Sequence, residues 1–257
     1  MKRTSAADHL QAQFTARGLD WIVPEWPAPA SVRAFSTTRS GEAGAAFDLS
    51  RRLASSTARA ELRRWLPREP VWLAQVHGSI VCDIDLIDFA SSRDPQADAA
   101  VARRLHNVCA VLTADCMPVL LTDPRGEVVA AAHAGWRGIA SGVLEATLAA
   151  MRVDAHGVLA WLGPAIGPRA FEVGADVFEA HCASDSGAAE CFLPQQPGKW
   201  LADLYELARR RLRRAGVTAI YGGGRCTLGE PALFYSYRRG GADAASRMAT
   251  VIWREQG

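Results

Sequence analysis

Apolar runs of strand length recur along the chain and predict most of its strands. They are rich in Val, Ile, Leu and Ala and are bounded by turn-forming residues. The runs span residues 32–36, 71–76, 80–84, 108–113, 119–122, 128–132, 158–162, 217–221 and 248–253. The segment Asp123-Pro124-Arg125-Gly126 is a strong turn signal, so we expect the two runs around it to form a hairpin.

Helical spacing of apolar positions appears in fewer segments. Residues 56–66 predict a helix with Ser56 or Thr57 as its N-cap, because Leu62, Trp65 and Leu66 share one face. The other predicted helices are residues 142–151, 175–182 and 201–215. Residues 1–20 form a polar lead-in with a short helix, and residues 37–50 and 90–100 are predicted to be loops.

The mixture of hairpins and scattered helices favours an α+β fold over a doubly wound parallel sheet. We find no internal repeat and no segment with the composition of a linker. The prediction is therefore one domain over residues 1–257, with a core from about residue 30 to residue 253.

Composition narrows the function classes. The 257 residues are 49% hydrophobic and 22% charged, as in ordinary globular proteins. A net charge of +2 gives no electrostatic footprint for nucleic acid. The first residues lack the apolar stretch of a signal peptide, so we expect neither a signal peptide nor a membrane span, and no two of the six cysteines form a C-x-x-C pair. We therefore expect a cytoplasmic monomer with free or metal-bound thiols that binds neither nucleic acid nor membrane.

Three segments carry the candidate chemistry. They are Gln75-Val76-His77-Gly78, Thr113-Ala114-Asp115-Cys116-Met117-Pro118 and Ala132-His133-Ala134-Gly135-Trp136-Arg137-Gly138. Each places a metal-binding or nucleophilic side chain near the end of an apolar run, where scaffolds display functional groups. Because Pro cannot donate to a central ladder, Pro118 predicts an irregular chain beside Cys116.

One Cys and two His are compatible with two kinds of chemistry and with a purely structural role. Three protein ligands with an open fourth position are typical of catalytic zinc. Alternatively, Cys116 is a nucleophile with His133 or His77 as its base. In the structural interpretation, all three are core side chains.

Arginine supplies 27 of the 29 basic residues, because only Lys2 and Lys199 are lysines. Most of this excess is compositional. Arg39, Arg137, Arg238 and Arg239 flank glycine-rich or aromatic segments and are candidate anion contacts. The helix expected after His133 would also favour an anion at its N-terminus.

The sequence resembles the YfiH-like, multicopper polyphenol oxidase or laccase-domain family, which includes purine nucleoside phosphorylases. The matching segments occur in the family's order. They are Phe35-Ser36-Thr37-Thr38-Arg39, Trp72-Leu73-Ala74-Gln75-Val76-His77-Gly78, Ala97-Asp98-Ala99, Leu112-Thr113-Ala114-Asp115-Cys116-Met117-Pro118, Ala132-His133-Ala134-Gly135-Trp136-Arg137-Gly138, Leu162-Gly163-Pro164-Ala165-Ile166-Gly167-Pro168 and Phe234-Tyr235-Ser236-Tyr237-Arg238-Arg239.

The resemblance implies a four-layer α/β/β/α sandwich, with one zinc ion, or copper, held by His77, Cys116 and His133. It also implies phosphorolysis of adenosine, inosine and methylthioadenosine, and deamination of adenosine. Two loops depart from the family pattern. The first reads Ser40-Gly41-Glu42 and then Phe47-Asp48-Leu49-Ser50. The second reads Arg238-Arg239-Gly240-Gly241 and then Ser246-Arg247-Met248. Substrate preference depends on whether these loops line the pocket.

The resulting hypothesis is a zinc-dependent purine nucleoside phosphorylase that takes a nucleoside and phosphate. Its catalytic residues are Cys116, His77, His133 and Asp115, the last as acid/base or as a group orienting a His ligand. The predicted substrate or phosphate contacts are Ser36, Arg39, Gln75 and Arg137. Three alternatives remain: a copper-dependent polyphenol oxidase, an amidase editing peptidoglycan precursors, and a non-catalytic metal-binding module.

Overall fold

The strands form three sheets in the computed structural model, which describes residues 6–50, 57–88 and 94–256. Their orders are β1-β12-β4, β11-β7-β5-β6-β3-β2 and β8-β10-β9. The strand bounds are β1 Val32–Ser36, β2 Val81–Asp83, β3 Ala99–Ala102, β4 Cys109–Thr113, β5 Met117–Thr122, β6 Val129–Ala134, β7 Leu159–Leu162, β8 Glu172–Val173, β9 Phe192–Pro194, β10 Trp200–Ala202, β11 Ala219–Gly222 and β12 Met248–Arg254. In the second sheet, β11 pairs with β7 and β2 with β3 in parallel, and the remaining pairs are antiparallel.

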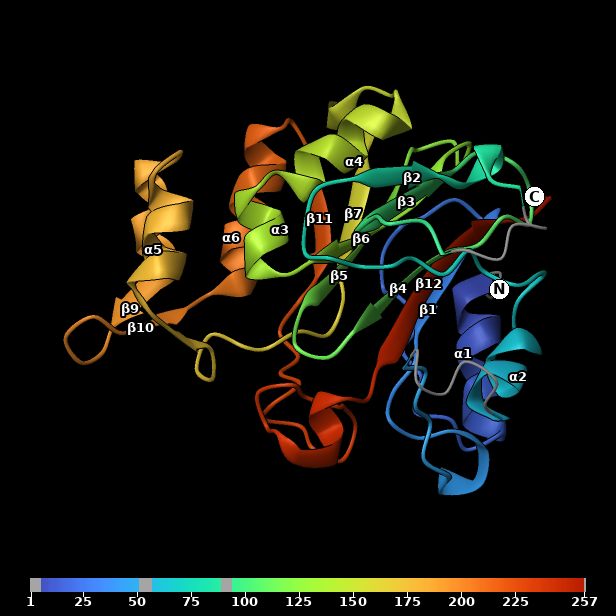
Figure 1. The fold of residues 1–257 in the computed structure, drawn as a ribbon. Coiled ribbons are helices and arrows are strands. Elements are labelled where there is room, and N and C mark those ends of the chain that lie inside the picture. Colours follow the sequence, from blue (N-terminus) through green and yellow to red (C-terminus); the bar gives the residue numbers. More distant parts are fainter. Residues whose placement is uncertain (1–5, 51–56, 89–93, 257) are drawn as a thin grey trace.

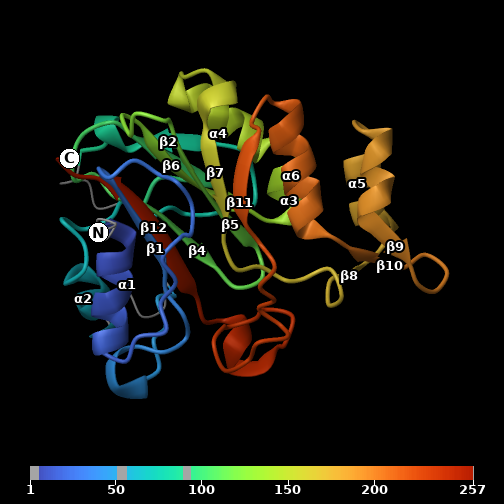
Figure 2. The same cartoon turned by 180° about the vertical axis from the view of Figure 1, so that it is seen from behind.

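The helices lie outside the two larger sheets (Figures 1 and 2). Their bounds are α1 Ala6–Ala16, α2 Thr57–Arg63, α3 Trp136–Ala140, α4 Val143–Met151, α5 Ala175–Cys182 and α6 Leu204–Arg214. Short 3-10 helices span Glu42–Gly44, Ile84–Leu86, Ala155–Gly157, Ser186–Cys191 and Gly241–Ala244. No helix in these described ranges has the length and apolarity needed to cross a bilayer.

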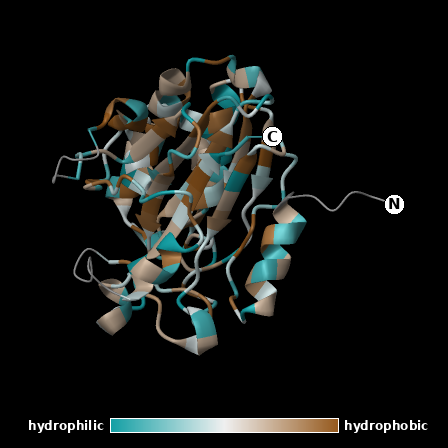
Figure 3. Cartoon of the chain, turned by 90° about the vertical axis from the view of Figure 1, so that its right-hand side faces the viewer, coloured by the Kyte–Doolittle hydropathy of each residue, from teal (hydrophilic) through white to brown (hydrophobic). Residues whose placement is uncertain are grey.

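Alternation along the strands sends apolar side chains to both faces of each sheet. In β1, Phe35 packs toward α1 and α2, whereas Val32 and Ala34 face the second sheet. In β5, Leu120 faces the first sheet. Met117, Val119 and Leu121 point to the opposite face and pack under α4 and α6. The central strands are accordingly the most hydrophobic part of the molecule (Figure 3).

The mixed α/β class predicted from the sequence is confirmed. The predicted hairpin is formed by β5 and β6, which pair from Met117↔Ala134 to Thr122↔Val129. The helix over residues 175–182 has the predicted bounds as α5. Of the two predicted N-caps, Ser56 lies outside the described residues and Thr57 is the first residue of α2.

Three other predictions need correction. Residues 71–76 form one bridge, Val71↔Cys109, and no strand. Residues 99 and 100, the end of the predicted loop, instead begin the wholly buried strand β3. The helix expected from residue 201 begins at Leu204 because Asp203 caps it by accepting from the Glu206 amide, and the preceding residues form β10.

The irregular chain predicted beside Cys116 is present at residues 114–116, between the end of β4 and the start of β5, whereas Pro118 itself lies inside the central strand β5, opposite His133. The Pro118 carbonyl accepts a hydrogen bond from the Gly163 amide at 2.9 Å, where β7 has ended. Proline cannot return the second bond of that pair. The buried Tyr205 hydroxyl lies 3.1 Å from the Gly163 carbonyl oxygen and 2.8 Å from that of Arg225, so the two carbonyls share its one proton.

Candidate metal centre and its cavity

His77, Cys116 and His133 come together at the ends of strands, where the chain crosses from the first sheet to the second. β4 ends at Thr113 in the first sheet and β5 begins at Met117 in the second, so Cys116 lies on the crossing between them. His133 is near the end of β6, and His77 lies in the loop before β2. The three ligand atoms lie within 4.8 Å of one another, so one metal ion could contact all of them.

Local backbone geometry is unusual at this point. His77 has φ +63° and Asp115 has φ +83°, values that residues other than glycine rarely adopt. Strained backbone of this kind concentrates at functional sites. Gly135 closes the other side, because a Cβ there would lie 2.7 Å from the Cys116 Sγ and 3.3 Å from the His77 Cδ2.

Asp98 is the principal site residue that the sequence analysis did not assign. Its side chain is fully buried, and Oδ1 lies 2.9 Å from the Nδ1 of His133. The same carboxylate accepts backbone hydrogen bonds from His77 at 2.8 Å, Gly78 at 2.7 Å and Val76 at 3.2 Å. Asp98 therefore fixes the ring of one candidate ligand and the backbone of the other, as carboxylates behind metal-bound histidines do.

Asp98 also explains why residues 71–76 do not continue as a strand. The amides at the end of this run donate to the carboxylate and not to a neighbouring strand. A lone acidic residue between Ala97 and Ala99, ahead of an apolar run, was the signal available in the sequence.

The charges of Cys116 and His133 support each other. Burial works against a thiolate, but the charge of His133 and hydrogen bonds from His133 and His77 lower the pKa of Cys116 to about 6. Burial likewise opposes the imidazolium, yet the Cys116 thiolate and the Asp98 carboxylate raise the pKa of His133 to about 9. Between these values the metal-free site holds an ion pair, and the thiolate is ready to bind a cation.

We expect iodoacetamide to alkylate Cys116 of metal-free protein with a midpoint near pH 6, because only the thiolate reacts and its pKa is lowered. The rate should fall below that pH as the thiol is protonated. Mass spectrometry of the Cys116 peptide measures the alkylation rate at each pH. The partly exposed Cys182 is the internal control, because burial and Asp185 raise the pKa of its thiol. Equal midpoints for the two cysteines would contradict the ion pair.

A cavity of about 680 Å³ opens over the three candidate ligands. This is within the range of about 300–1,000 Å³ that small-molecule sites occupy. Its wall contains aromatic and cationic side chains beside aliphatic ones. Those aromatic and cationic residues are Trp136, Phe171, Tyr237, Arg137, Arg238 and Arg247.

Of the predicted substrate contacts, Gln75 and Arg137 line this cavity, and Ser36 and Arg39 do not. The Gln75 amide is held on both sides by the Leu112 backbone, since its Nε2 donates to the carbonyl and its Oε1 accepts from the amide, each at 2.8 Å. The helix expected after His133 is α3, with five residues. So short a helix has too small a dipole to make an anion site.

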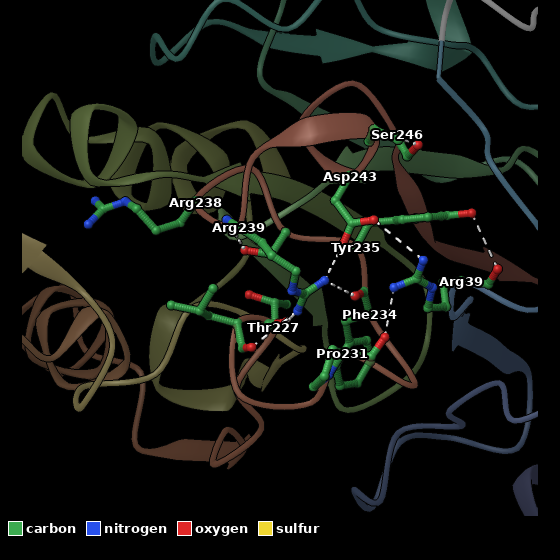
Figure 4. Close-up of polar contacts among 12 residues, drawn as sticks. Arg39, Thr227, Pro231, Phe234, Tyr235, Arg238, Arg239, Asp243 and Ser246 are labelled. Carbon is green, nitrogen blue, oxygen red and sulfur yellow. Dashed lines mark hydrogen bonds and ion pairs between the residues drawn. The ribbon is translucent and has the colours of Figure 1, made fainter.

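Ser36 and Arg39 have other partners in the structure. Ser36 is buried in β1, and its hydroxyl lies 2.8 Å from that of Thr250 in β12. The Arg39 guanidinium donates to the Pro231 carbonyl at 2.7 Å, pairs with Asp243 and lies over the Tyr235 ring (Figure 4). Both side chains hold neighbouring segments together.

Asp115 lines the cavity, but its carboxylate faces the C-terminal loop. It accepts hydrogen bonds from the hydroxyls of Thr227 at 2.5 Å and Ser236 at 2.9 Å, and from the Arg238 amide at 2.7 Å. The carboxylate that orients a histidine is Asp98. Asp115 instead anchors the loop that carries Tyr237 and Arg238.

A family model described as multi-copper polyphenol oxidoreductase laccase matches residues 38–255. The chain belongs to the YfiH-type laccase-domain family. It is 46% identical to the purine nucleoside phosphorylase YfiH of Escherichia coli over 243 residues, covering 90% of this chain and 98% of that protein. A purine nucleoside phosphorylase of Pseudomonas aeruginosa is 46% identical over 244 residues, covering 91% and 98%.

Solved structures show the same fold. A Neisseria meningitidis protein of this family superposes with a TM-score of 0.85 and 42% identity, covering 92% of this chain and 100% of that one. YlmD from Geobacillus stearothermophilus gives a TM-score of 0.76 with 27% identity, covering 90% and 94%. The family resemblance found in the sequence is thus confirmed.

Proposed function

We propose that this protein is a zinc-dependent purine nucleoside phosphorylase. The observation that carries the proposal is one cavity that contains both the His77, Cys116 and His133 group and arginines on its wall. Relatives that share 46% of its residues over almost their full length are named purine nucleoside phosphorylases. The cavity provides for an anion and an aromatic ligand together, as a nucleoside and phosphate require.

The donor set fits zinc. One thiolate and two imidazoles are ligands that Zn²⁺ accepts, and the Asp98 carboxylate behind His133 makes that ring a better donor. When bound, zinc would supply a Lewis acid with an open position facing the cavity. A laccase needs several copper ions, whereas the described ranges contain one group of three such ligands.

In phosphorolysis a phosphate oxygen forms a bond to C1′ of the ribose while the bond from C1′ to the purine nitrogen breaks. The purine leaves with that electron pair and takes up a proton. The protein has to hold the phosphate beside C1′ and to shield the reacting atoms from water. Leu73, Leu112 and Ile166 supply apolar wall for the nucleoside, and Trp136 and Phe171 supply aromatic surface.

Substrate scope depends on the two loops in which this chain departs from the family pattern. Ser50 of the first loop lines the cavity, as do Ala245 and Arg247 of the second. The Asp48 carboxylate joins these loops by accepting the amides of Ser50 and Arg247. Adenosine, inosine and methylthioadenosine should therefore be compared directly, together with deamination of adenosine.

Zinc-loaded protein should convert adenosine and phosphate to adenine and ribose 1-phosphate, because the cavity offers both a nucleoside wall and arginines for the anion. The assay is chromatography of the base with a coupled measurement of ribose 1-phosphate. Omitting phosphate is the control, since inosine formed without phosphate reports deamination alone. If zinc-loaded protein releases no base from any of the three nucleosides, the proposed activity is wrong.

A further inference from the structure

The arginines in and beside the cavity fall into two sets, apart from Arg247, whose Nη1 donates to the carbonyls of Ala244 and Ser246, each at 2.8 Å. Arg39 and Arg239 both pair with Asp243 and donate to backbone carbonyls of the C-terminal loop (Figure 4). Arg239 reaches the carbonyls of Phe234 at 3.0 Å and Thr227 at 2.6 Å. Since these two guanidiniums share one carboxylate and use further N–H groups on backbone carbonyls, they stabilise the loop and have little hydrogen-bonding capacity left for an anion.

Arg137 and Arg238 form the second set. Each guanidinium lies over an aromatic ring of the cavity wall, 4.2 Å from the Trp136 centroid and 5.4 Å from that of Phe171. No carboxylate among the described residues pairs with either guanidinium. The Nη1 of Arg238 donates a hydrogen bond to the Glu172 carbonyl at 2.9 Å. Stacking on a ring restrains a guanidinium while leaving its edge N–H groups available.

Both arginines are fixed to the segments that carry the candidate metal ligands. Arg137 follows His133 by four residues, after Gly135, which packs against the Cys116 thiol. The Arg238 amide donates to the Asp115 carboxylate at 2.7 Å, and Asp115 directly precedes Cys116. Both arginines thus line one cavity, and each is carried by a segment that is fixed to the site.

We propose that Arg137 and Arg238 are the phosphate-binding residues of this cavity. Two planar forks match the oxygens of a dianionic phosphate and compensate its charge. Asp115 is then a positioning residue that holds Arg238. The proposal deepens the proposed function, since it names how the co-substrate is bound.

The test compares Arg137→Gln and Arg238→Gln with Arg169→Gln. Arg169 is an exposed arginine outside the cavity wall, so its loss changes the net charge equally. Inorganic phosphate binding to zinc-loaded protein is followed by 31P NMR titration, and KM for phosphate and for adenosine is measured separately. Because Arg137 and Arg238 are exposed, all three variants should fold, which thermal denaturation checks.

We expect each cavity variant to weaken phosphate binding about tenfold or more, as loss of a charge-assisted contact implies. KM for phosphate should rise in parallel while KM for adenosine changes less than about twofold. Arg137→Lys and Arg238→Lys should recover part of the loss, because they restore the charge without the fork. The Arg169→Gln protein should match the wild type.

The NMR titration separates this inference from the proposed function. If wild-type protein binds phosphate, the variants lose it and no nucleoside is cleaved, the two-arginine site stands and the phosphorylase proposal fails. If wild-type protein cleaves adenosine and both variants bind phosphate normally, the two-arginine site is wrong and the activity stands. Absence of phosphate binding to the wild type also overturns the inference.

Discussion

Replacing Cys116 by Ser should remove the zinc ion and abolish phosphorolysis. The thiolate is the one anionic ligand in the group, and the site stabilises it by lowering the pKa of Cys116 to about 6. A serine hydroxyl stays protonated and is a poor zinc ligand. Loss of a residue behind the ligands typically costs about 10–100-fold, so loss of a ligand should cost activity at least about 100-fold.

Elemental analysis and turnover of the Cys116→Ser protein measure these two effects. Cys182→Ser is the matched control, because Cys182 is also partly exposed but lies at the end of α5, outside the cavity. It should keep full zinc and full activity. Zinc bound at wild-type stoichiometry and affinity by the Cys116→Ser protein would show that the metal is held elsewhere.

The second large effect is expected from Asp98→Asn. The substitution keeps the shape of the side chain but places an amide NH₂ where one carboxylate oxygen accepts hydrogen bonds. Either the His77 amide and the His133 ring or the amides of Val76 and Gly78 then face another donor. We expect zinc affinity to fall about 10–100-fold. The free energy of unfolding should fall by about 1–3 kcal/mol.

Asp123→Asn separates the effect on zinc from the effect on stability. Asp123 is equally buried and accepts amides from Arg125, Glu127 and Val128 at the turn between β5 and β6. No histidine contacts it in the described structure, so its variant should be destabilised while zinc affinity stays unchanged. Zinc competition with a chromophoric chelator provides the comparison. If the Asp98→Asn and Asp123→Asn proteins bind zinc with equal affinity, Asp98 does not position the metal ligands.

The elements that the sequence predicted well are those whose pattern is local. The hairpin of β5 and β6 follows from two apolar runs around Asp123-Pro124-Arg125-Gly126, and α5 follows from its own helical spacing. The strand β3 was missed because its alanines have little β-propensity, and their burial between other strands decides the structure. Pro118 correctly indicated irregular chain beside Cys116, but its own place inside β5 could not be predicted, since the Tyr205 hydroxyl near the Gly163 carbonyl is distant in sequence.

The candidate site divides in the same way. His77, Cys116 and His133 could be predicted from residue type and position, because each follows or ends an apolar run, and the structure brings them together. Asp98 and Asp115 could not be told apart by sequence, since their roles depend on which groups surround each carboxylate. The separation of Arg39 from Arg238 likewise depends on Asp243, which pairs with one and leaves the other unpaired.

The central claim is that a metal ion held by His77, Cys116 and His133 is required for phosphorolysis. The most direct test is the rate of ribose 1-phosphate formation from adenosine and phosphate by one preparation in three states: zinc-loaded, stripped with a chelator, and reloaded with zinc. Stripping should remove the activity, and one equivalent of zinc should restore it. An undiminished rate in protein shown by elemental analysis to be metal-free would contradict the central claim.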